Sequence, residues 1–148
     1  MGFDRSDQRA LALWAADCAE RVLPLFERQY PSDDRPRKAI EAARSWTRGE
    51  IRVGEARAAA VAAHAAARTV VESAARAAAR AAGQAAATPH MAGHARHAAA
   101  YAVRAVAPID APEERGWQYQ RLPERLRAVI FPAGGKSAAT PSRAASSR

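Results

Sequence analysis

The chain has 148 residues, the size of a single domain, and 42 of them are alanine while aromatic residues make up only 6%. Its net charge is +8, its single cysteine excludes an intramolecular disulfide, and arginines interrupt the alanine stretches, which excludes a membrane span. Because the N-terminus lacks the apolar segment of a signal peptide, we expect a cytoplasmic protein. A core of such small residues requires helix backbones to approach one another closely.

The first predicted helix begins near Asp4 or Ser6, either of which can cap it. The apolar residues that recur with helical spacing are Leu11, Trp14, Cys18, Val22, Leu25 and Phe26. Pro24 lies inside this pattern, and because proline removes a backbone hydrogen bond, we expect a kink or a break around residues 21–24. Cys18 lies on the apolar face, so we expect its thiol in the core.

The middle of the chain is predicted to be helical almost throughout. One helix spans about 35–48. Residues 54–87 form either one long helix or two helices that meet near 70–73, where two adjacent valines and a serine weaken helix propensity. A threonine cap followed by proline then predicts that the next helix begins at residues 88–89 and runs to about residue 107.

The C-terminal part is predicted to contain two short helices within residues 112–131. Residues 132–148 are small, polar and turn-forming, with three basic residues and no acid, so we expect a disordered basic tail. No segment alternates apolar and polar residues as a strand does. The sequence therefore predicts one domain over residues 1–131, an all-α, alanine-rich bundle of about six to eight helices.

A stripe of polar residues is the most distinctive pattern in the expected fourth or fifth helix. His90, His94, His97, Tyr101 and Arg104 follow one another at steps of four, three, four and three residues. On an α-helix these steps place all five side chains within about 80° of arc. The stripe is therefore a candidate functional surface.

Three interpretations of these histidines are open. Histidines four residues apart can bind one divalent metal, so His90 and His94, with His64 from the preceding helical stretch, form a candidate metal site. The rings can also join neighbouring helices through hydrogen bonds, or contact a partner. No acidic residue lies between Glu72 and Asp110 to supply the carboxylate that metal hydrolases usually add.

Other residues point to binding rather than to catalysis. Trp117 lies among arginines and aromatic residues, a composition typical of an interaction hot spot, and it is either a core anchor or an exposed contact. The arginines are dispersed and many have acids nearby, which favours solvated helix faces over nucleic-acid binding, although a basic nucleic-acid-binding protein stays an alternative. We find no arrangement for nucleophilic catalysis and expect no enzyme.

Three segments resemble a known family. They are RPRKAIEAA at 35–43, AAHAAAR at 62–68, and the pattern T-x-H-x-x-G-H-A at 88–95, followed by AAYA. In their order and content they are similar to the immunity-protein-five-like family of bacterial immunity proteins, over about residues 8–107. The chain departs from the family pattern at Gln84, where histidine is common, and at Arg96 and His97.

The resemblance implies a helical antidote that neutralises a cognate toxin by stoichiometric protein–protein binding, without catalysis and without a cofactor. The candidate contact residues are His64, His90, His94, His97, Tyr101 and Trp117. A charge of +8 fits an acidic toxin better than it fits mimicry of nucleic acid. Helices of small residues also pack between subunits, so a homodimer is left open.

Overall fold

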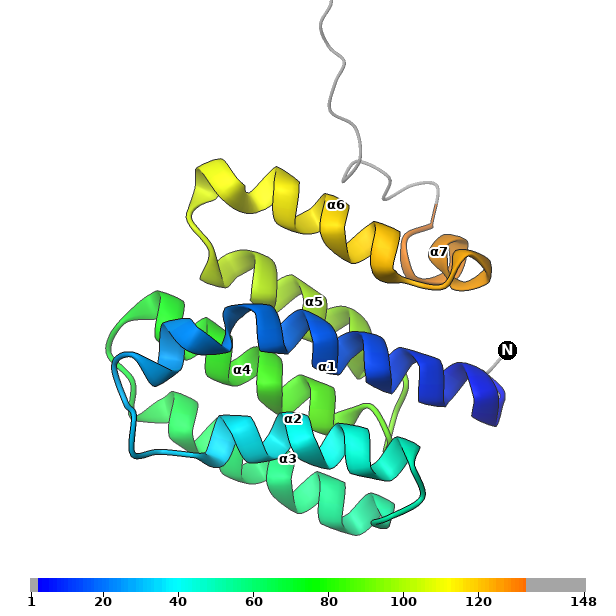
Figure 1. Cartoon of the computed structure of the whole chain (residues 1–148), viewed down its shortest axis with the longest axis horizontal. Coiled ribbons are helices and arrows are strands. Elements are labelled where there is room, and N and C mark those ends of the chain that lie inside the picture. The colour runs from blue at the N-terminus through cyan, green and yellow to red at the C-terminus, as the bar shows by residue number, and fades with distance from the viewer. Residues whose placement is uncertain (1–2, 133–148) are drawn as a thin grey trace, which may run out of the picture.

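The computed structural model describes residues 3–132, and this part of the chain contains seven α-helices and no strand (Figure 1). The helices are α1 (Arg5–Glu27), α2 (Arg35–Thr47), α3 (Val53–Arg68), α4 (Ser73–Ala87), α5 (His94–Ala105), α6 (Ala111–Arg121) and α7 (Glu124–Ile130), with a 3-10 turn at Pro108–Asp110. The predicted all-α bundle is confirmed. The tail expected over 132–148 lies, apart from Pro132, outside the described residues.

Helix α4 is the centre of the bundle. It packs against α1, α2, α3 and α5, and nine of its fifteen residues are buried, eight of them alanine. In Figure 1 it lies behind α1, between α5 and the pair formed by α2 and α3. A helix coated with methyl groups can be approached from every side, which is why four helices surround it.

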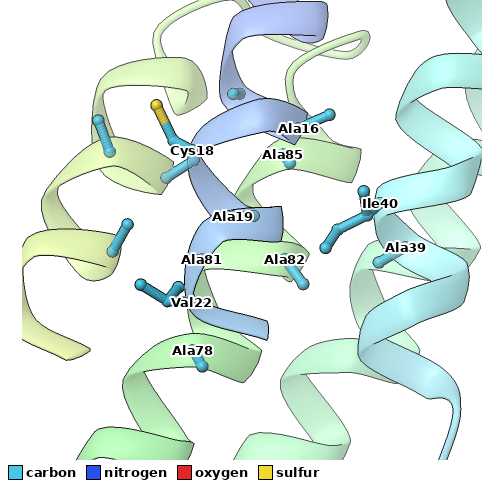
Figure 2. Packing of buried hydrophobic residues seen from close by; sticks show 14 of the residues in the cluster. Ala16, Cys18, Ala19, Val22, Ala39, Ile40, Ala78, Ala81, Ala82 and Ala85 are labelled. Carbon is cyan, nitrogen blue, oxygen red and sulfur yellow. The ribbon is translucent and has the colours of Figure 1, made fainter. Parts of the chain in front are cut away.

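The crossing of α1 over α4 shows how close this packing is. Ala16 and Ala19 of α1 and Ala82 and Ala85 of α4 are all fully buried, and Ile40 extends from α2 towards the same crossing (Figure 2). Because these side chains are single methyl groups, the two backbones approach without a gap. Larger side chains occupy the other face of α1, where Leu11 and Trp14 are buried.

Helices α6 and α7 cover that other face through a buried polar bridge. The indole of Trp14 donates to the carbonyl of Gln118 at 2.8 Å, and the Gln118 side chain donates to the carbonyl of Ala99 at 2.9 Å. These bonds link α1, α5 and α6. Leu126 and Ile130 of α7 add apolar contacts to the same core.

Of the kink or break expected around Pro24, the structure excludes the break. Asp4 caps α1 as predicted, accepting a hydrogen bond from the Asp7 amide at 2.8 Å, but the helix runs through residues 21–24 to Glu27 without a break. The proline ring is exposed, so it displaces no packing, and its carbonyl accepts from the Arg28 amide at 3.0 Å. Burial of Phe26 keeps the last turn on the core.

The remaining boundaries confirm some expectations and correct one. The second helix and the two short helices within 112–131 are present, and 54–87 is divided into α3 and α4 around Val70. The helix expected from Thr88 begins instead at His94. Thr88 is fully buried and its hydroxyl donates to the carbonyl of Gln84 at 3.1 Å, so it ends α4 rather than opening α5. Within residues 3–132, no helix is long and apolar enough to cross a bilayer.

The packing of α4 predicts a strong penalty for any larger side chain there. We expect Ala81→Leu to lower the free energy of unfolding by about 1–3 kcal/mol, because the fully buried Cβ of Ala81 leaves no room for an isobutyl group. The same change at exposed Ala58 of α3 is the control and should cost less than about 0.5 kcal/mol. Guanidinium chloride unfolding measures both, and equal effects at the two positions would contradict the packing described here.

Candidate functional site

The charges of the protein are divided between two regions of the bundle. Within residues 3–132, every ion pair joins residues outside α3, α4 and α5. Arg44, for example, contacts both Asp17 and Glu20 at 2.7 Å, and Arg21 pairs with Glu114 at 3.0 Å. The arginines of the other region therefore keep charges that no carboxylate of the described chain balances.

A groove between α4 and α5 collects three of these arginines. It is an open pocket of about 440 Å³ lined by Ser73, Arg76, Ala77 and Arg80 of α4 and by Tyr101 and Arg104 of α5. We call these six residues the arginine groove. In Figure 1 these two helices lie next to each other, with α4 in the middle of the bundle and α5 above it.

Uncharged partners hold two of the three arginines. The guanidinium of Arg76 donates to the carbonyl of Val70 from Nε at 3.2 Å and from Nη2 at 2.9 Å, which ties it to the loop between α3 and α4. The guanidinium carbon of Arg104 lies 4.8 Å from the centre of the Tyr101 ring, one turn earlier on α5. Each guanidinium therefore contacts a neutral group and no carboxylate.

The third arginine is held by a neutral histidine. Arg80 Nη1 lies 2.9 Å from His64 Nδ1. Arginine has only donors, so this nitrogen of His64 accepts, and the proton of the neutral ring is on Nε2. Burial lowers the pKa of His64, and the charges of Arg80 and Arg68 lower it further. The neutral form that Arg80 needs as an acceptor is thus the favoured one.

Gly83 provides the space for the His64 ring. A Cβ at this position would lie 2.7 Å from both Cε1 and Nε2 of His64. The close contact at this glycine is thus made by a side chain of α3. Gly83, His64 and Arg80 form one chain of contacts from α4 to α3 and back.

The stripe of histidines is only partly formed. Residues 94 to 104 lie on α5 as expected, but His90 lies in the turn before the helix, where it is exposed, because α5 begins at His94. His94 Nδ1 lies 2.7 Å from the side-chain oxygen of Gln84, so it donates to α4. Burial lowers the pKa of His94, and nearby His97 and His90 add to the effect. His97 is exposed, with its ring 6.3 Å from that of His94.

The structure does not bring together the metal ligands that the spacing indicates. Among residues 3–132, no three His, Cys, Asp or Glu side chains are grouped so that they could hold a metal ion. Nδ1 of His64 is used by Arg80 and Nδ1 of His94 by Gln84. A guanidinium at 2.9 Å also opposes a second cation at His64. These two histidines join helices, as the structural interpretation of the stripe predicts.

Trp117 is not one of the residues that line the arginine groove. It is half-buried against the core, with the guanidinium carbon of Arg21 4.2 Å and that of Arg121 5.5 Å from its ring. Arg21 is in turn paired with Glu114 of the same helix as Trp117. Trp117 is thus an anchor between α1 and α6, with its ring covered by arginines.

The arginine groove is the feature that the sequence reasoning missed. Tyr101 and Arg104 were recognised as part of the stripe, but Arg76 and Arg80 were grouped with dispersed, solvated arginines. A signal was present, because residues 73–109 contain four arginines and no acid. Charge counted per helix, rather than over the whole chain, would have indicated this face.

Comparison with known proteins identifies one family. Residues 2–125 match the family described as "Imm-5 like putative immunity protein". No curated protein and no solved structure matches the chain.

The two half-buried histidines, His64 and His94, predict a loss of stability in mild acid. Both titrate below their ordinary pKa in the folded chain, so between about pH 7.5 and pH 5.5 the unfolded state binds more protons. Bound protons then favour unfolding, and the free energy of unfolding should fall as the pH falls. Denaturant unfolding at the two pH values measures this change. The control is the His64→Gln/His94→Gln variant, whose stability should depend less on pH; a wild-type stability that rises towards pH 5.5 is the contrary result.

Proposed function

The chain belongs to the Imm-5 like putative immunity protein family, and we propose that it is an antidote that silences a bacterial toxin by binding it in a stoichiometric complex. The family match carries this proposal. It spans α1 to α6 and the first residues of α7, and therefore most of the bundle rather than one alanine-rich helix.

The packing of the bundle supports a binding role. An antidote that acts by occupying a surface binds more tightly when its own surface is ordered before the encounter, because less entropy is lost on association. The alanine contacts around α4 join four helices into one core. Side chains on the rim of that core are consequently presented from rigid elements.

The reactive side chains support a passive rather than a catalytic role. Cys18 is fully buried, and burial together with the charges of Asp17 and Glu114 raises the pKa of its thiol well above the ordinary value. His64 and His94 each use Nδ1 to hold a neighbouring helix. Cys18, His64 and His94 are thus engaged in holding the fold together.

Co-expression with the neighbouring gene product tests the proposal. We expect a toxin-like reading frame beside this gene to stop growth when it is expressed alone, and growth to return when the two are expressed together. In purified form, the chain should abolish the toxin's activity at an equimolar ratio, because each antidote molecule occupies one toxin molecule.

Two outcomes would contradict this function. The proposed function is wrong if all neighbouring gene products are harmless when expressed alone. It is also wrong if they stay toxic when this chain is expressed with them in folded form. Silencing of a large molar excess of toxin would instead indicate a catalytic mechanism. Light scattering of the mixture, with each protein alone as the control, measures the stoichiometry of the complex.

A further inference from the structure

We propose that the arginine groove is the surface on which the toxin docks, and that it receives an acidic segment of that protein. This inference rests on the proposed function and adds the binding face and the chemistry of the partner. It assigns roles to Arg76, Arg80 and Arg104, which the family match leaves open.

The first support is the balance of charge around the groove. Three guanidinium groups border one pocket, and no residue from Ser73 to Ile109 is acidic. The acid next to the groove in sequence, Glu72, accepts a hydrogen bond from the Tyr30 hydroxyl at 2.9 Å. The electrostatic potential in the groove is therefore positive. Carboxylates of a partner would neutralise this charge.

The second support is that the arginines are fixed without being neutralised. Carbonyls of the α3–α4 loop hold Arg76, neutral His64 holds Arg80, and the ring of Tyr101 supports Arg104. Several arginines outside the groove are instead fixed by carboxylates, as Arg44 is by Asp17, although Arg127 also donates only to carbonyls. A guanidinium that neutral partners already hold loses less conformational entropy when it binds a ligand. Its remaining N–H donors are still free, and their planar arrangement fits a carboxylate.

The third support separates a protein partner from a nucleic acid. Grooves that bind single strands combine positive charge with exposed aromatic rings on which bases stack. Here the only aromatic residue that lines the described groove is Tyr101, and Arg104 covers its ring at 4.8 Å. A compact pocket of about 440 Å³ also suits one or two carboxylate side chains better than a long phosphate backbone.

Peptide binding to the full chain tests the groove directly. The probe is a fluorescent deca-glutamate peptide, whose binding is followed by anisotropy at low and at moderate salt. Deca-thymidylate, a single-stranded nucleic acid, is the comparison polyanion. We expect the Arg80→Glu/Arg104→Glu variant to raise the Kd for deca-glutamate by about tenfold or more. The Arg80→Gln/Arg104→Gln variant removes charge without introducing acid and should weaken binding less, with the fold of each variant checked by circular dichroism.

A charge-matched control separates the groove from net charge. Arg9→Glu/Arg28→Glu changes two exposed arginines at the ends of α1 that make no ion pair within the described chain, and it lowers the net charge by the same amount. We expect less than about a twofold change in Kd. Equal losses in both double variants, no loss in the groove variants, or tighter groove-dependent binding of deca-thymidylate each overturn the proposal.

The toxin assay distinguishes this inference from the function on which it rests. If the wild-type chain protects cells and the Arg80→Glu/Arg104→Glu variant does not, while the Arg9→Glu/Arg28→Glu control does, the groove is the docking face. If a folded groove variant protects as well as the wild type, the docking face is wrong and the antidote function stands. If the wild type silences no neighbouring toxin, the function fails and with it the assignment of the groove to a toxin.

Discussion

The methyl-lined contact between α4 and its four neighbours is the constraint on which the rest of the molecule depends. Where Ala82 and Ala85 meet Ala16 and Ala19, no side chain reaches far enough to fill a gap, so the backbones themselves must come close. Alanine is also the best helix former, so the residues that allow close packing stabilise each helix on its own. The bulky residues of α1 are then free to face α6 and α7, where Trp14 and Gln118 bridge three helices.

The same packing explains how cationic side chains come to be held by neutral groups. Close approach of α3 and α4 brings His64 over Gly83, and only a position without a Cβ accepts its ring. From there His64 meets Arg80, which faces the groove shared with α5. Most carboxylates of the described chain lie on α1, on α6 and in the segments that flank α2, and several of them pair with arginines and join helices. The ion pairs of the described chain thus lie outside α3, α4 and α5, and the arginines of the groove have neutral partners only.

Local patterns in the sequence predicted the elements better than the contacts between them. The Asp4 cap and the weak point at residues 70–73 follow from residues a few positions apart, and both are confirmed. Helix α1 continues past Pro24 because its last turn is buried through Phe26, and the error at Thr88 arose because its hydroxyl ends α4. Pairs such as His64 with Arg80 depend on how two helices pack, which helical spacing within one segment does not specify.

The most direct measurement is an amide chemical-shift map of the labelled chain as the inactivated product of the neighbouring toxin gene is added. The account predicts that the largest shifts fall on residues 73–80 and 101–104, with smaller ones at His64 behind Arg80, and that α1 and α2 change little. Shifts that centre on α1 and α2, or on α6 around Trp117, would contradict the view that the unpaired arginines form the binding face.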